Sequence, residues 1–126
     1  MRKKILLAED EKALQILYRE ELEEEGYEVY TVGNGQEALN RFQEGTFDLV
    51  IIDLRMPVMD GLEALSRLRS QNEKVPVLIH SSHPEYENDP RSLLANRFIK
   101  KSGDLRELKA KIRELLGPPL HPDSEQ

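Results

Sequence analysis

The sequence predicts an α/β fold, in which a doubly wound, five-stranded parallel sheet is covered on both faces by five helices. Short apolar runs alternate along the chain with amphipathic stretches, which is the pattern of repeated strand–helix–strand units. Residues 49–52 form a continuous apolar run, which is typical of a central strand covered on both faces. A length of 126 residues fits one such domain with one hydrophobic core.

The first half of the chain predicts three strands and two helices. In order, these are a strand at residues 4–8, a helix at 13–25, a strand at 28–32, a helix at 36–44 and a strand at 49–52. The two helices are assigned because their apolar residues recur at helical spacing. The residues expected on the buried face of the first helix are Leu14, Leu17, Tyr18 and Leu22. Gly26 marks the end of that helix.

The second half continues the alternation less regularly. In order, it predicts a helix at residues 62–69, a strand at 75–79, a weak strand at 97–100 and a helix at 105–116. Pro76 stands near the start of its strand, where a missing N–H is tolerated. Ser102 can cap the last helix. The stretch 82–96 is rich in helix breakers and only residues 92–95 look helical, so the fourth helix is expected to be short or displaced.

Bulk properties argue against several classes of protein. A net charge of −6 and a pI near 5.1 would repel a phosphate backbone, so direct nucleic-acid binding is not expected. No apolar run approaches the roughly 18 residues that span a bilayer, and the run at 5–8 is too short for a signal-peptide core. The absence of cysteine excludes disulfides and thiolate metal sites. We therefore expect a cytoplasmic domain over residues 1–117, followed by a flexible tail or truncated linker at 118–126.

Five chemically active side chains fall at the carboxyl ends of predicted strands, where the loops of a doubly wound sheet form its ligand site. They are Glu9 and Asp10 after the first strand, Asp53 after the third, Ser81 at the end of the fourth and Lys101 after the fifth. Neighbouring strands are about 4.8 Å apart, so the three carboxylates can converge. Such crowding is unfavourable unless a cation offsets it. Mg²⁺ has the required preference for oxygen ligands and keeps waters that a phosphate can displace.

Each of these residues also has an ordinary structural interpretation. A single aspartate at a strand end is usually a turn or helix-cap residue, and the triple arrangement argues against that interpretation. Lys101 can neutralise phosphoryl oxygens, or it can be a surface lysine like its neighbour Lys100, and strand alternation does not choose between them. The hydroxyl of Ser81 can donate to a phosphoryl oxygen, but Ser82 shares this chemistry.

Four segments together resemble the response-regulator receiver family of two-component systems. They are Glu9-Asp10-Glu11 after an apolar strand, Asp53-Leu54-Arg55-Met56-Pro57-Val58-Met59-Asp60-Gly61, Pro76-Val77 leading to Ser81, and Phe98-Ile99-Lys100-Lys101. The match covers roughly residues 3–116, and the segment that starts at Asp53 is its most specific element. The resemblance implies a flavodoxin-like, three-layer sandwich with strand order 2-1-3-4-5.

The resemblance also implies a role for each matched residue in the pocket. Asp53 matches the phospho-acceptor, a carboxylate nucleophile that attacks the phosphorus of a phosphohistidine donor. Asp10 matches the direct Mg²⁺ ligand, and Glu9 matches the acidic neighbour that usually holds a metal-bound water. The backbone carbonyl of Arg55 matches the main-chain metal ligand. Lys101 matches the lysine that binds the phosphoryl group.

Two further matches imply a conformational switch. Ser81 matches the hydroxyl that moves toward the phosphoryl group, and Phe98 matches the aromatic ring whose rotamer follows that movement. The implied partners are a sensor histidine kinase or phosphotransfer protein and a downstream target or output domain. A phosphorylation-dependent homodimer is also compatible, whereas no membrane is implied. Such a protein promotes only its own phosphorylation and dephosphorylation, and is not a turnover enzyme.

The chain departs from the family pattern at several positions. The acidic pair is Glu-Asp where Asp-Asp is commoner, Ser81 replaces a more frequent threonine, and Ser102 stands where proline often follows the lysine. The interval from Ser81 to Lys101 is shorter than the family leads us to expect. It contains the fourth helix, which belongs to the family's usual output face, so this departure affects partner choice and not the chemistry.

Three rival functions each require residues that can be checked in the sequence. A non-phosphorylated, receiver-like docking module would be expected to lose an acidic ligand, the acceptor or the lysine, yet all are present. An aspartate-nucleophile phosphatase needs a second acid two residues beyond its nucleophile, where this chain has Arg55. A flavin carrier needs a hydroxyl- and glycine-rich phosphate loop after the first strand, where the acidic residues 9–11 would repel a phosphate. The docking module is the alternative that we retain.

Two histidines lie near the end of the fourth predicted strand. His80 and His83 are three positions apart across a strand end, which is poor spacing for a metal pair. His83 lies two residues after Ser81, close to the expected mouth of the pocket. We hypothesise that His83 modulates the lifetime of the phosphoryl group.

Overall fold

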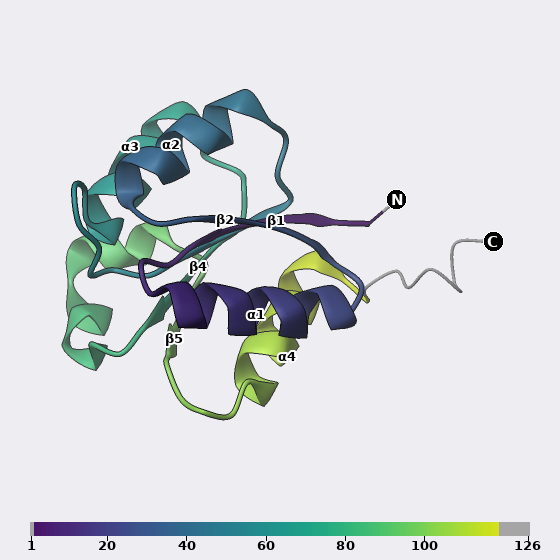
Figure 1. Ribbon diagram of the computed structural model, residues 1–126. Coiled ribbons are helices and arrows are strands. Elements are labelled where there is room, and N and C mark those ends of the chain that lie inside the picture. The colour runs from purple at the N-terminus through teal and green to yellow at the C-terminus, as the bar shows by residue number, and fades with distance from the viewer. Residues whose placement is uncertain (1, 119–126) are drawn as a thin grey trace.

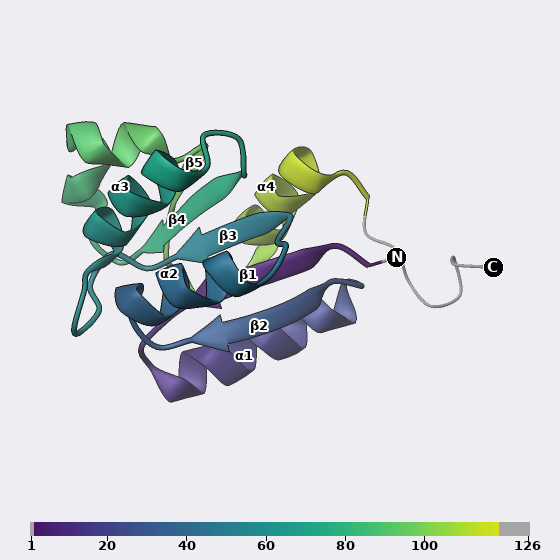
Figure 2. The same cartoon turned by 90° about the horizontal axis from the view of Figure 1, so that it is seen from above.

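A computed structural model describes residues 2–118 and arranges them in three layers, a sheet between two layers of helices (Figure 1). The strands are β1 (Lys4–Ala8), β2 (Glu28–Val32), β3 (Leu49–Ile52), β4 (Val77–Ser81) and β5 (Arg97–Lys100). They lie in the order β2-β1-β3-β4-β5, and every neighbouring pair is parallel. Figure 2 shows the sheet from above, with β2 near one edge and β5 at the other. The predicted doubly wound sheet and its strand order are confirmed.

Helices cover both faces of the sheet. They are α1 (Lys12–Glu24), α2 (Gly35–Glu44), α3 (Gly61–Gln71) and α4 (Arg106–Leu116). The pair α1 and α4 lies on one face, and the pair α2 and α3 lies on the other (Figure 1). Because successive strand residues point to opposite faces, β1 supplies Ile5 and Leu7 to the core under α1 and α4, and Leu6 and Ala8 to the core under α2 and α3. This double coverage explains the continuous apolar runs of the sequence.

The segment between β4 and β5 contains two short 3₁₀ helices, η1 (Pro84–Asn88) and η2 (Pro90–Leu94), where a fourth α-helix was expected to be short or irregular. That expectation is confirmed, and the chain has four α-helices within the described residues. Proline can begin a helical turn but cannot continue one, because it lacks the N–H and clashes with the preceding turn. Pro90 therefore separates η1 from η2, and the Asp89 side chain accepts a hydrogen bond from the Arg91 N–H.

Three local predictions were wrong. The fourth strand begins at Val77 and not at Val75, because Val75 is tied into the turn after α3 by hydrogen bonds to Arg69 and Asn72. Ser102 does not cap α4, since its hydroxyl exchanges hydrogen bonds with the backbone of Asp104. Leu17 is 44% exposed, and Gln15 takes a place on the buried face of α1 with Tyr18 and Leu22.

The last helix, α4, ends at a glycine. After Leu116 the chain turns at Gly117, whose φ of 81° is a conformation that glycine adopts without strain. The predicted boundary after residue 117 stays a prediction, and residues 119–126 of the predicted tail lie outside the described residues. Across residues 2–118, no helix is both long and apolar enough to cross a membrane.

Candidate functional site

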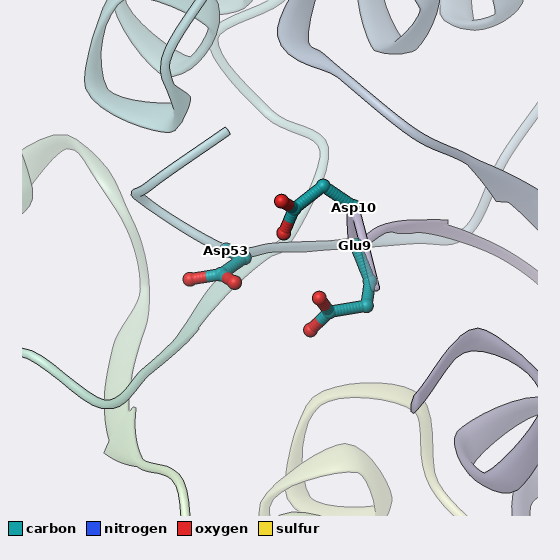
Figure 3. A group of neighbouring side chains, drawn as sticks. All are labelled: Glu9, Asp10 and Asp53. Carbon is teal, nitrogen blue, oxygen red and sulfur yellow. The ribbon is translucent and has the colours of Figure 1, made fainter. Parts of the chain in front are cut away.

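The carboxyl ends of the parallel strands bring the predicted acidic residues to one edge of the sheet. Ala8 pairs with Ile52 in the β1–β3 register, and the Asp53 N–H donates to the Ala8 carbonyl at 3.0 Å. Glu9, Asp10 and Asp53 each contribute one carboxylate oxygen to a group whose members all lie within 4.8 Å of one another. Figure 3 shows the three carboxylates directed toward a common space. The structure therefore brings together the three residues that the sequence predicted to converge.

A glycine sets the position of the loop that follows Asp53. The Gly61 N–H donates to the Leu54 carbonyl at 2.8 Å, which folds the loop at residues 54–60 back onto the end of β3. A Cβ atom on Gly61 would lie 2.1 Å from the carbonyl oxygen of Asp53. Since no larger residue fits this approach, glycine is required here. The next helix starts directly afterwards, with Asp60 accepting a hydrogen bond from the Glu63 N–H as its N-cap.

Lys101 lies between two of the three carboxylates. Its Nζ atom donates to Glu9 Oε1 at 2.5 Å and to Asp53 Oδ2 at 2.9 Å. The sequence did not decide whether Lys101 enters the pocket or lies on the surface like Lys100. In the structure the Lys101 side chain is 13% exposed and directed into the pocket, while Lys100 is exposed. An ammonium group in this place offsets part of the negative charge that the carboxylates concentrate.

The protonation equilibria of Glu9 and Lys101 reflect this crowding. Burial raises the pKa of the Glu9 carboxyl above its ordinary value, and hydrogen bonds from Lys101 and the Glu11 N–H offset that effect only in part. Burial alone would lower the pKa of Lys101, but its hydrogen bonds to Glu9 and Asp53 reverse the direction and raise it. Lys101 is therefore an ammonium ion at neutral pH.

Ser81 is fully buried at the end of β4, whereas Ser82 is exposed. The Ser81 hydroxyl accepts a hydrogen bond from the His83 N–H at 3.0 Å, and its carbonyl accepts one from the Lys101 N–H at 2.8 Å. The structure thus distinguishes the two serines that the sequence left as alternatives. In this state, Ser81 Oγ makes no hydrogen bond to Asp53 within the described part of the chain.

Phe98, on β5, pairs with Ile79 of β4 and is half-buried against the apolar core under α2 and α3. The ring of Tyr86, from η1, packs against the same core. Tyr86 also makes an edge-on contact with His83, with ring centroids 6.2 Å apart. Phe98, whose rotamer is predicted to respond to movement of Ser81, therefore packs against the same apolar core as Tyr86 of the segment between β4 and β5.

The donor set of the pocket fits a hard divalent cation. Arg55 offers a backbone carbonyl that accepts no hydrogen bond from residues 2–118, and its exposed side chain makes none with them. The Asp10 carboxylate is likewise exposed and without a hydrogen bond to any described residue. Mg²⁺ takes one or two carboxylates and retains several waters, so a half-open set of three carboxylates and one carbonyl suits it.

The sequence did not reveal the surroundings of the two histidines near the end of β4. His80 is buried and packs edge-on against Tyr18, with ring centroids 5.1 Å apart. Burial, together with the charge of Lys101, lowers the pKa of His80 to about 4, so its ring is neutral at pH 7. His83 instead lies 3.4 Å from the Glu85 carboxylate. The two histidines have different surroundings, and neither belongs to the carboxylate group.

Comparison with known proteins places this geometry in context. The family model for the response regulator receiver domain matches residues 5–113. Sporulation initiation phosphotransferase F of Bacillus subtilis is 30% identical, over 92% of this chain and 95% of that protein. The chain spans about half the length of other curated relatives, such as the B. subtilis transcriptional regulatory protein YkoG, which is 36% identical over 89% of this chain and 50% of that protein.

Solved structures give the same result. The response regulator TrrA of Thermotoga maritima, determined in complex with Mg²⁺ and BeF, is 39% identical and superposes with a TM-score of 0.89. The comparison covers 90% of this chain and 99% of TrrA. A second structure, of the histidine kinase ThkA in complex with TrrA, matches with a TM-score of 0.86 over 90% of this chain and 98% of that chain.

Proposed function

This chain belongs to the response regulator receiver domain family of two-component signalling, and from that premise we propose that Asp53 accepts a phosphoryl group from a histidine kinase or a phosphotransfer protein. The observation that carries the proposal is the placement of the Asp53 carboxylate beside both an ammonium group and two further carboxylates. A nucleophile needs one free oxygen, and Lys101 engages only Oδ2 of Asp53. The transfer forms an O–P bond to Asp53 and breaks the N–P bond of the donor, whose electron pair stays on the imidazole nitrogen.

Lys101 and the acidic residues have separate tasks in this transfer. Lys101 donates to Asp53 before the reaction, and a phosphoryl oxygen is the natural new acceptor for the same ammonium group. Asp10, Asp53 and the Arg55 carbonyl would hold a Mg²⁺ ion directly, with Glu9 holding one of its waters. When bound, that ion neutralises charge on the carboxylates and the phosphoryl oxygens. The docking-module alternative gives no reason for this complete set of groups.

The response to phosphorylation would pass through the β4 end. The buried Ser81 hydroxyl lies at the end of β4, three residues before η1, and accepts a hydrogen bond from the His83 N–H. Rotation of that hydroxyl toward a phosphoryl group would alter this contact, and Phe98 and Tyr86 would repack in the core that they share. The change would be read by a downstream protein or output domain. In this role the domain assists its own phosphorylation and hydrolysis and has no turnover substrate.

Incubation with acetyl phosphate and Mg²⁺, followed by intact-mass measurement, tests the proposal. One phosphoryl adduct is expected on the wild-type chain, and it should be labile to hydroxylamine as an acyl phosphate is. Asp53→Asn should abolish the adduct, whereas Asp104→Asn, at an exposed position outside the carboxylate group, should not. Labelling of Asp53→Asn at the wild-type level would refute the acceptor assignment.

A further inference from the structure

Gln15 is a buried polar residue on α1 that touches the ends of two strands. Only 8% of the residue is exposed to solvent. The amide nitrogen Nε2 donates to the Glu9 carbonyl at 2.5 Å and lies 3.3 Å from the Val32 carbonyl. Glu9 N–H also donates to Val32 O, at 3.0 Å. One side-chain amide therefore joins α1 to the carboxyl ends of both β1 and β2.

The Glu9 carbonyl belongs to the peptide unit that leads into Asp10. Among the described residues, Gln15 is the one donor to that carbonyl. Asp10 is exposed, and its carboxylate makes no hydrogen bond with any residue that the structure describes. Because no hydrogen bond from residues 2–118 holds the Asp10 side chain, its direction depends on the backbone that carries it.

The rest of this loop is fixed through the Glu9 side chain. Glu9 Oε2 accepts from the Glu11 N–H at 2.9 Å, and Glu9 Oε1 accepts from Lys101. These contacts hold the Glu9 carboxylate and the amide after Asp10, but they leave the peptide plane before Asp10 unrestrained. We propose that Gln15 is a positioning residue for divalent-cation binding, which fixes this plane and thereby aims Asp10 at the space shared with Asp53. The proposal rests on the proposed function, because it assigns Gln15 to the same cation site.

A purely structural role for Gln15 is the competing explanation. A buried amide that bridges two strand ends also stabilises the fold, and a hydrogen bond of this kind contributes about 1 kcal/mol. The two roles differ in what they predict for the folded protein. A positioning role affects cation affinity when every molecule is folded, whereas a structural role affects only the folded fraction.

Gln15→Met tests the contact, because methionine has a similar length and no hydrogen-bond donor. Gln36→Met is the matched control. Gln36 is exposed on α2, away from the site, and its amide donates to Asn40 Oδ1 of the same helix at 3.0 Å. Mg²⁺ and Ca²⁺ affinities are measured by calorimetric titration at a temperature at which each variant is fully folded. The dissociation constant for Mg²⁺ should rise about tenfold in Gln15→Met. Ca²⁺ tolerates irregular coordination, so its constant should change less, and selectivity for Mg²⁺ should fall.

Three results decide the matter. An unchanged Mg²⁺ affinity in folded Gln15→Met would overturn the proposal, even if the variant melts at a lower temperature. Equal losses of Mg²⁺ and Ca²⁺ affinity would also overturn it, because a preorganised site discriminates between them. If Gln15→Met does not fold, Gln15→Asn tests the same contact with a retained but shorter amide, and a weaker Mg²⁺ affinity is again required. Failure of the wild-type chain to bind Mg²⁺ would instead refute the proposed function.

Discussion

Lys101 Nζ lies 2.9 Å from Asp53 Oδ2, although the two residues are 48 positions apart in the chain. The contact exists because β3 and β5 flank β4 and end at the same edge of the sheet. It gives Asp53 a cationic partner before any phosphoryl group arrives. The same ammonium group holds Glu9, so that one lysine joins the ends of three strands.

Replacing Lys101 should separate catalysis from folding. We expect Lys101→Met to slow phosphorylation by acetyl phosphate about a hundredfold, because a donor directed at the developing phosphoryl charge is lost. The rate is measured by intact mass at saturating Mg²⁺. Lys100→Met is the matched control, since Lys100 is the exposed preceding residue, at the end of β5. Comparable slowing in the two variants would contradict a specific role for Lys101.

His80 should make the protein sensitive to mild acid. Its pKa is lowered from 6.5 to about 4, first by burial and then by the charge of Lys101. The folded state therefore disfavours the protonated ring, so the stability contributed by His80 is complete above pH 6.5 and is lost as the pH falls toward 4. The loss should reach about 3 kcal/mol, at 1.36 kcal/mol per pKa unit.

Urea unfolding of the wild type and of His80→Leu, at pH 7 and at pH 4.5, checks this expectation. Leucine occupies a similar volume beside Tyr18 and cannot be protonated. Other titrating groups are common to both proteins, so the difference between the two pH slopes isolates His80. Identical slopes in the two proteins would show that the His80 ring is not held neutral.

Gly61 should tolerate no side chain. A Cβ atom there would lie 2.1 Å from the Asp53 carbonyl and 2.8 Å from the Leu54 Cα. We expect Gly61→Ala to lower the free energy of unfolding by roughly 3 kcal/mol, because the backbone itself must shift. Gly103→Ala is the control, since nothing lies within 4 Å of its added Cβ. Chemical denaturation measures both, and equal stabilities would mean that the loop adapts freely.

His83 is the remaining candidate for control of phosphoryl lifetime. Its backbone N–H holds Ser81, and its ring lies between Glu85 and Tyr86. We expect His83→Ala to keep the backbone contact but to open the pocket mouth, so that hydrolysis of the phosphorylated form accelerates severalfold. The decay of the phosphoryl adduct is followed by intact mass after removal of acetyl phosphate. Equal half-lives in wild type and variant would remove His83 from the mechanism.

The parts of the fold that depend on local pattern could be predicted from the sequence. β1, β2, β3 and β5 have the predicted bounds, because apolar runs and turn residues set them. The start of β4 was missed, since the side chains of Arg69 and Asn72, at the end of α3, hold Val75 in the turn before the strand. The pattern of apolar residues does not reveal such side-chain hydrogen bonds.

The same limit applies to the site. The carboxylates could be predicted to meet, because residues that directly follow parallel strands share one edge of the sheet. Gln15 could not be recognised, because the carbonyls near its amide belong to residues 9 and 32 and come together only in the folded chain. Leu17 was placed inside by its apolar character, yet the strand ends need a donor, and Gln15 occupies the buried position instead.

Mapping the phosphoryl group to one residue tests the central claim most directly. The chain is phosphorylated with acetyl phosphate and Mg²⁺ and reduced with borohydride, which converts an aspartyl phosphate to homoserine. Peptide mass spectrometry then locates the modified position. The account predicts homoserine at Asp53 and at no other carboxylate. Homoserine at Asp10 or Asp60 instead, or unmodified Asp53 in a fully phosphorylated sample, would contradict it.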